Sequence, residues 1–370
     1  MVKDKIVSWF IRNYLLPRAQ IIDKPGFIAF DISYKVDIYL RQFLLPESIF
    51  VEIEQKLEPS LLYKIGKIFG YNFAEFSNTV TLEDVSTKKF LEYTKIMVKF
   101  VEGTYSSNIK YKINLKDKLI DFRMKNFIIC RNTGGGHIFS EGGIAGIWAW
   151  ALQDPTIEAI QPKCQGRGDS ECEVIAAPYH TLIKMGYKPF KCSKLEKLEI
   201  TKDYQQFNQI RKTKWSNNSL RTLLDSGFLQ YEHGQVIYKK ERFFMCEASF
   251  IYILERELAK IKNGLKILWE CSFAFGKKLA SLIEKQDPCK FITDFFPALG
   301  FGDVLVVEKE RNYEIFVNYF PWLDWWKDIE FVMFRGWLSG IISGLTRQNH
   351  QLNTIKKDVS GGYLSLHITR

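Results

Sequence analysis

The sequence predicts an α+β protein built as two tandem copies of one domain, each with an antiparallel sheet packed on helices. The main observation is an internal repeat: a shift of 194 residues, without a gap, superimposes Gly142 on Gly336 and Gly146 on Gly340. With loop-sized gaps, the repeat extends upstream, where Phe50 matches Phe250. A long period in only two copies is typical of duplicated domains and not of a solenoid.

Composition is the second observation. The chain has 370 residues, of which 46% are hydrophobic and 15% aromatic, so each half is long enough to bury its own core. No apolar run reaches the roughly 18 residues that a membrane-spanning helix needs. The seven cysteines are an odd number without a secretory framework, which favours a reducing compartment, and we expect a cytoplasmic protein.

These patterns divide the chain into four segments. We expect a short amphipathic helix at 1–25, a first domain at 26–178, a basic connector at 179–226 and a second, degenerate domain at 227–370. The connector carries ten Lys or Arg against four Asp or Glu. Such a segment can bind an acidic surface, such as a protein partner, nucleic acid or anionic lipid, or it can be a solvated linker.

The expected elements of the first copy follow in one order, and the second copy repeats it. Alternation at 35–40 favours a strand. Pro46 then opens a helix with Glu47 in its first turn. The glycines at 134–136 form a loop. No Gly-Lys-Ser/Thr follows them, which disfavours a phosphate-binding loop. The remaining elements are helices at 60–77, 84–101 and 142–152 and strands at 108–114, 119–129, 157–163 and 172–176, with counterparts that include 271–283, 304–307 and 364–369.

Two helices of the first copy carry the candidate ligand-binding residues. Gly142 and Gly146 stand on one face of the helix at 142–152, which predicts close packing against a neighbouring helix or sheet. Phe69 and Phe73 lie at helical spacing in the helix at 60–77, and Trp148 lies in the glycine helix. These three aromatic side chains either line a pocket for a small hydrophobic molecule or fill the core.

One hairpin carries the candidate chemistry. In the stretch from Cys164 to Cys172 the midpoint is Gly168, so a turn there brings the two thiols opposite each other. That placement suits a disulfide, two ligands of one metal, or two buried inert thiols. For zinc, His137 is the nearest additional soft ligand, with Gln161 or an acid such as Glu158 to complete the set.

These residues resemble the 4-vinyl-reductase-type domain. The most specific part runs from Glu141-Gly-Gly-Ile-Ala-Gly146 to the hairpin with Cys164 and Cys172; the second copy matches by architecture and glycines only. The resemblance implies an α+β domain related to bacterial hydrocarbon sensors and to trafficking-complex subunits, a small apolar ligand, and often a dimer. It also implies zinc in the first copy, with His137 in place of a cysteine and Gln161 in place of a glutamate.

Three interpretations of function stay open. The first is a non-enzymatic binding or sensor protein for a small hydrophobic ligand, with the two domains as a pseudo-dimer within one chain. The second is an enzyme or accessory protein of tetrapyrrole metabolism, although no dinucleotide fingerprint is visible. The third is a trafficking or assembly scaffold whose connector docks a partner. The sequence names neither the ligand nor the oligomeric state.

Overall fold

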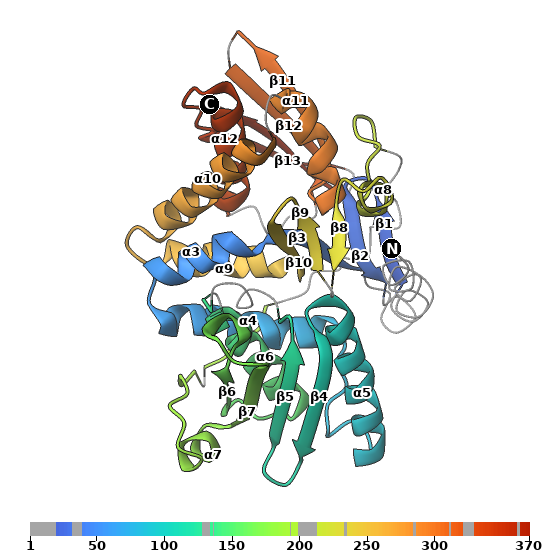
Figure 1. The fold of residues 1–370 in the computed structure, drawn as a ribbon, viewed down its shortest axis with the longest axis vertical. Helices are drawn as coiled ribbons and strands as arrows, with labels where there is room; N and C mark the ends of the chain where they lie inside the picture. Colours follow the sequence, from blue (N-terminus) through green and yellow to red (C-terminus); the bar gives the residue numbers. More distant parts are fainter. Residues whose placement is uncertain are drawn as a thin grey trace.

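The computed structural model describes residues 20–31, 39–127, 134–135, 137–192, 194–198, 213–232, 235–283, 286–310, 312–320, 329–360 and 363–370. It confirms the predicted α+β class, with helices and antiparallel sheets in three stacked parts (Figure 1). Residues 1–19 of the helix expected at 1–25 and residues 35–38 of the strand expected at 35–40 lie outside the described residues. At 20–24 the expected helix is wrong, because these residues form a strand.

The lower part of Figure 1 comes from the first half of the chain. A four-stranded sheet in the order β4-β5-β7-β6 lies against the helices of this half. The elements are α4 (Pro59–Phe76), α5 (Thr87–Thr104), β4 (Ser107–Asn114), β5 (Leu119–Lys125), α6 (His137–Ala151), β6 (Ile157–Lys163), the short 3-10 helix η2 (Gln165–Arg167), β7 (Cys172–Pro178) and α7 (Tyr179–Lys184).

The upper part comes from the second half, and its four-stranded sheet has the order β11-β12-β14-β13. In both sheets the first strand along the chain lies at one edge, followed by the second, the fourth and the third. A duplicated domain would give this correspondence. The elements are α10 (Gly264–Ile283), α11 (Pro288–Phe295), the 3-10 helix η4 (Pro297–Leu299), β11 (Asp303–Lys309), β12 (Asn312–Phe320), α12 (Val332–Thr346), β13 (Thr354–Ser360) and β14 (Tyr363–Thr369).

The middle part is a six-stranded sheet to which each half contributes three strands, in the order β1-β2-β3-β10-β9-β8. Its central pair is antiparallel, with Leu44 opposite Met245 and Leu45 opposite Phe244. The halves are therefore joined through a shared sheet and are not two separate units. The strands are β1 (Gln20–Lys24), β2 (Phe27–Asp31), β3 (Tyr39–Pro46), β8 (Gln230–Glu232), β9 (Gln235–Tyr238) and β10 (Glu241–Glu247).

Two helices cross over between the halves. The helix α3 (Glu47–Lys56) follows β3 and packs on α10 of the second half, whereas α9 (Ser249–Ala259) follows β10 and packs on α4 of the first half. Both lie between the upper and lower parts in Figure 1. The antiparallel central strand pair and the reciprocal helix contacts are compatible with the expected pseudo-dimer within one chain, which stays a prediction.

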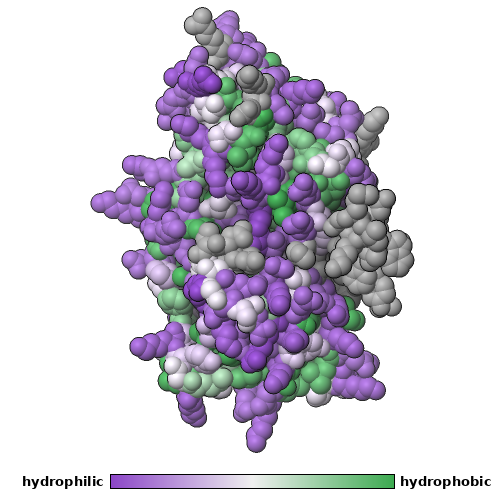
Figure 2. Space-filling model, in the orientation of Figure 1, coloured by the Kyte–Doolittle hydropathy of each residue, from purple (hydrophilic) through white to green (hydrophobic). Residues whose placement is uncertain are grey.

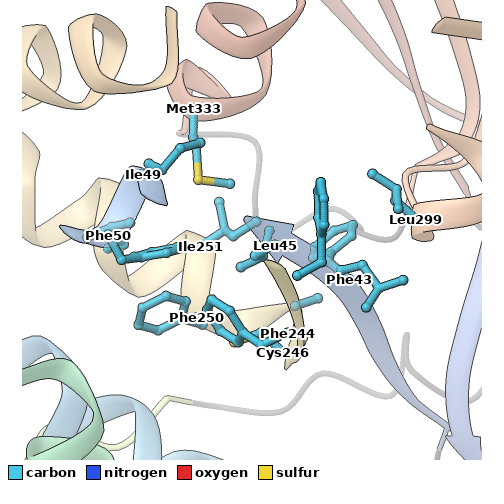
Figure 3. Packing of buried hydrophobic residues seen from close by; sticks show 14 of the residues in the cluster. Phe43, Leu45, Ile49, Phe50, Phe244, Cys246, Phe250, Ile251, Leu299 and Met333 are labelled. Atoms are coloured by element: carbon cyan, nitrogen blue, oxygen red, sulfur yellow. The ribbon is translucent and has the colours of Figure 1, made fainter. Parts of the chain in front are cut away.

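Aromatic and aliphatic side chains from both halves fill the junction (Figure 3). The ring of Phe50 on α3 lies 5.4 Å, between centroids, from both Phe244 on β10 and Phe250 on α9. By contrast, the face of the molecule in Figure 2 is mostly hydrophilic, with smaller groups of hydrophobic residues between. Across the described part of the chain, none of the helices is long and apolar enough to cross a membrane.

Two glutamates cap the glycine-containing helices in the same way. The Ile138 N–H at the start of α6 donates to Glu54 Oε2 over 3.0 Å, and the Val332 N–H at the start of α12 donates to Glu255 Oε2 over 2.9 Å. A carboxylate is favourable at a helix N-terminus because it accepts otherwise unpaired N–H groups and meets the positive end of the helix dipole. These contacts fix α6 against α3 and α12 against α9.

Glycines let the helices of each pair touch through their backbones. A Cβ on Gly146 would lie 2.2 Å from the Lys67 carbonyl oxygen of α4, and a Cβ on Gly142 would lie 2.2 Å from that of Tyr63. In the second half, a Cβ on Gly340 would lie 2.1 Å from the Phe273 carbonyl oxygen of α10. The close approach predicted from the glycine spacing is thus an α6–α4 contact, and α12 meets α10 in the same register.

The described parts of the basic connector are held against the protein. Fully buried Asn72 on α4 accepts from the Leu198 N–H over 2.7 Å and donates to the Glu196 carbonyl oxygen over 2.9 Å. Farther along, buried Asp303 accepts from the Ser216 N–H over 3.0 Å, just before the short helix α8 (Leu220–Asp225). The solvated-linker interpretation is therefore wrong for these stretches. Six described lysines nevertheless remain exposed: Lys184, Lys188, Lys191, Lys194, Lys197 and Lys214.

Neighbouring glycines of α6 should respond oppositely to the same substitution. Gly146→Ala forces its Cβ into the Lys67 carbonyl and should lower the free energy of unfolding by roughly 1–3 kcal/mol. At Gly143 a Cβ would meet only the Gly66 oxygen at 3.9 Å, so Gly143→Ala should gain up to about 1 kcal/mol from helix propensity. Urea unfolding of both variants checks this, and changes of equal sign would contradict the packing described.

The cap at Glu255 predicts a pH dependence. Burial raises the pKa of Glu255 to about 7 from an ordinary 4.5, against the lowering effect of its two N–H donors. Between these values the folded state binds more protons than the unfolded state, so the stability from this group falls as pH rises through the window.

Glutamine does not titrate. The free energy of unfolding of Glu255→Gln should therefore rise relative to that of the wild type as pH rises, by at most about 1.4 kcal/mol per pH unit. Urea unfolding at pH values on both sides of the window measures the difference. A constant difference across the window would contradict the raised pKa.

Candidate ligand-binding cavity

An apolar cavity of about 220 Å³ lies in the lower part of the molecule. Its walls come from α4, α5, α6 and β5 of the first half and from β10 and α9 of the second half. Most of the lining side chains are aromatic or aliphatic. The cavity therefore exists at the point where the first half meets the shared sheet.

All three aromatic residues proposed from the sequence line this cavity. The rings of Phe69 and Phe73 on α4 have centroids 5.9 Å apart, and Phe69 lies 5.0 Å from Phe250 of α9. Trp148 on α6 donates its indole N–H to the Lys118 carbonyl oxygen over 3.2 Å. Because that N–H is paired, the indole ring can line the cavity at no cost in hydrogen bonding.

The helix α5 closes one side of the cavity. Its inward face carries Phe90, Thr94, Met97, Val98 and Val101, at the spacing of one helix face. The hydroxyl of Thr94 donates to the carbonyl oxygen of Phe90 over 2.9 Å, so this polar group is satisfied within its own helix. The periodicity was visible in the sequence at 84–101, but it did not identify this face as a cavity wall.

The second half supplies the wall that the sequence did not reveal. Residues Phe244–Glu247 of β10, together with Phe250 of α9, line the cavity of the first half. They reach it because β10 pairs with β3 and α9 crosses onto α4. Pairing between strands about 200 residues apart leaves no local pattern in a single sequence.

The equivalent position in the second half is filled by a tryptophan. The glycine register matches Gly143, which lines the cavity, with Trp337 on α12, which is fully buried. The indole of Trp337 lies 5.3 Å from Phe275 and 4.7 Å from Phe296, between ring centroids. Where the first half leaves space next to a glycine, the second half is packed with aromatic rings.

Zinc binding by the residues proposed as its ligands stays a prediction, and these residues lie around the turn of one hairpin. Cys164 and Cys172 are buried and adjacent at the closing end of the β6–β7 hairpin, with Gly168 in the left-handed conformation at the turn. His137 is the first residue of α6, and its Nε2 lies 3.1 Å from the guanidinium Nη1 of Arg167. A cation at that position disfavours a second cation.

Gln161 and Glu158 also have other roles. The Arg167 guanidinium donates to the Gln161 carbonyl oxygen over 2.6 Å. Glu158 forms a buried ion pair with Lys67 at 2.8 Å and accepts from the Tyr63 hydroxyl over 2.8 Å. Within the described residues, no three His, Cys, Asp or Glu side chains lie close enough together to hold a metal ion. Cys130, the first of the seven cysteines along the chain, lies outside the described residues.

Burial leaves His137 and its neighbour Glu141 uncharged near neutral pH. Burial, and then the nearby Arg167, lowers the pKa of His137 to about 4. Burial raises the pKa of Glu141 to about 8, although the Gln161 N–H donates to its Oε1 over 2.6 Å. His137 Nε2 lies 3.9 Å from Glu141 Oε1, and both pKa shifts disfavour the charged forms of this pair.

Comparison of the sequence with protein-family models gives no match, and comparison with curated proteins gives none either. The resemblance to the 4-vinyl-reductase-type domain therefore remains a prediction that depends on the residues quoted for it. The function of the cavity has to be argued from its own geometry and chemistry.

The thiols of the hairpin give a direct test of the zinc hypothesis. With Arg167 beside His137, we expect no stoichiometric zinc in protein purified without added metal. Cys172→Ser should then lower the free energy of unfolding by roughly 1–3 kcal/mol, from lost packing and a buried hydroxyl, equally with and without chelator. Elemental analysis and thermal unfolding measure this. Bound zinc that is lost together with stability in Cys172→Ser would contradict this expectation and support the predicted metal site.

Proposed function

We propose that this protein binds a small apolar molecule in the cavity of its first half, as a non-enzymatic binding or sensor protein. The size of the cavity supports this. An engineered apolar cavity of about 150 Å³ stays dry and binds benzene. The cavity here, at about 220 Å³, is larger and suits a molecule of one or two rings. A tetrapyrrole macrocycle, with four rings, exceeds that space, which disfavours the tetrapyrrole interpretation.

The chemistry of the wall supports binding over catalysis. The described lining residues include no histidine, lysine or arginine. The thiol at the wall is that of Cys246, and burial, with Glu247 close by, raises its pKa well above the ordinary value. A thiol in that state is a poor nucleophile, because the thiolate is the reactive form.

The contrast between Gly143 and Trp337 carries the proposal. Filling a core position with an aromatic ring is the ordinary solution, and the second half adopts it. The first half leaves the matching position open beside a glycine, within a wall of rings from both halves. A ligand in that space would contact both halves at once, which suits a sensor.

The scaffold interpretation remains a prediction, testable by a pull-down with the connector charges reversed.

Gly143→Trp gives the first half the residue that the second half already has. The indole should fill the cavity, so the variant should stay folded and lose ligand binding. A thermal-shift screen of the full chain with single-ring and two-ring hydrocarbons provides the measurement. In the wild type, a ligand at 100 times its Kd should stabilise by about 2.7 kcal/mol.

Gly143→Ala is the matched control, because its methyl group takes up little of the cavity, and it should still bind. A folded Gly143→Trp variant that binds as tightly as the wild type would overturn the proposal. So would a wild-type protein that responds to no member of the panel.

A further inference from the structure

We infer that part of the basic connector docks the protein on an anionic lipid surface, with Ile183 and Met185 entering the interface and the lysines around them contacting the headgroups. The residues concerned are 179–192 and 194–198, which include α7 and the described chain that follows it. We call them the basic segment. The inference goes beyond the proposed function and does not depend on the cavity.

The basic segment is strongly positive. It carries five lysines against a single acid, Glu196, and the stretch 179–192 contains neither Asp nor Glu. All five lysines are exposed. Lys197 pairs with Glu75 on α4 over 2.9 Å, so the other four are assigned to the lipid headgroups: Lys184, Lys188, Lys191 and Lys194. An anionic lipid surface strengthens binding by about fivefold for each lysine that lies near it.

Two acids at the basic segment have cationic partners outside it. Glu158 accepts from the Cys192 N–H over 2.7 Å, and it forms its ion pair with buried Lys67. Glu196 lies 3.1 Å from the guanidinium group of Arg256 on α9. Because each of these carboxylates faces a cation of its own, neither competes strongly with lipid headgroups for the exposed lysines.

Two large apolar side chains are exposed among these lysines. Ile183 and Met185 are 44% and 45% exposed, and they stand on either side of Lys184 in the sequence. Single exposed apolar residues are ordinary on a protein surface and need no explanation. Exposed apolar side chains next to lysines are typical of segments that lie in the interfacial region of an anionic membrane.

The fold holds Ile183 and Met185 at the surface. Their neighbour Leu182 is fully buried and packs on β7, so it anchors α7 to the lower sheet. The chain then turns at Gly186, which is in the left-handed conformation, and the Tyr187 N–H donates back to the Leu182 carbonyl oxygen over 3.1 Å. A turn fixed in this way loses little conformational entropy on docking. In Figure 1, α7 lies at the lower end of the molecule, away from the shared sheet.

A lipid surface fits these features better than a protein or a nucleic acid does. A stable protein interface buries about 800 Å² on each partner, of which two half-exposed apolar side chains are a small part. Sites for single-stranded nucleic acid combine basic groups with aromatic rings on which bases stack, whereas the exposed apolar side chains here are the aliphatic Ile183 and Met185. Aliphatic side chains enter the headgroup and acyl boundary of a membrane without a shaped partner.

Sedimentation with lipid vesicles tests the inference on the full chain. The vesicles consist of phosphatidylcholine alone, or of phosphatidylcholine with about a third of phosphatidylserine. The wild type should bind the vesicles that contain phosphatidylserine and not those of phosphatidylcholine alone. Binding should weaken at high salt, because ions screen the attraction between lysines and headgroups.

A pair of double variants separates this surface from the net charge of the protein. Lys184→Gln with Lys188→Gln should weaken binding to the anionic vesicles by at least about tenfold, since two contacts of about fivefold each are removed. Lys262→Gln with Lys266→Gln is the matched control, because both lysines are exposed but lie at the start of α10 and just before it. This control removes the same charge and should bind within about twofold of the wild type.

Ile183→Ser with Met185→Ser tests the apolar contribution at unchanged charge. Because both side chains are already exposed, the variant should stay folded, which circular dichroism checks. It should bind the anionic vesicles several-fold more weakly than the wild type, since less apolar surface leaves water.

Three results would overturn the inference. The first is wild-type protein that binds neither kind of vesicle, or both equally. The second is a folded Lys184→Gln, Lys188→Gln variant that binds no more weakly than the control. The third is a polyglutamate peptide or a single-stranded oligonucleotide that binds the wild type more tightly than the vesicles do, which would replace the lipid surface as partner. Gly143→Trp, which fills the cavity, should bind vesicles like the wild type, so this test and that of the proposed function can fail separately.

Discussion

The backbone contact between the glycine helix and its partner determines the geometry of each half. On α6, Gly142 and Gly146 approach α4 so closely that a Cβ would lie 2.2 Å from a carbonyl oxygen at either position. A contact this tight allows one register of the two helices. Since Gly143 is the residue after Gly142, that register also fixes which residue faces the cavity. The same register in α12 and α10 places Trp337 at the matching point. One face of the glycine helix therefore sets its packing against the partner helix, and the adjacent face carries the residue that fills the core or leaves it open.

The shared sheet turns two similar halves into one molecule with unequal cores. Because β3 and β10 pair and α3 and α9 cross over, each half is completed by elements of the other. In the second half the result is a packed aromatic core around Trp337. In the first half it is a cavity whose wall includes the end of β10. A molecule bound there contacts both halves, so its binding free energy would also stabilise their association.

Sequence reasoning recovered what depends on local periodicity and missed what depends on long-range pairing. Helical spacing identified Phe69 and Phe73, and the glycine helix identified Trp148; all three line the cavity. The wall supplied by β10 was not visible, because its position follows from strand pairing with β3. The zinc hypothesis took Cys164, Cys172 and His137 from spacing and resemblance. That hypothesis stays a prediction; Arg167, from the turn between the cysteines, lies against the imidazole, a contact that residue spacing does not reveal.

The two halves differ at one matching position of their glycine helices, and this difference bears on the cavity. Gly143 preserves the space, and Trp337 shows that the same scaffold accommodates a residue that would remove it. The difference between these two positions is the observation that supports the proposed binding of a ligand in the first half.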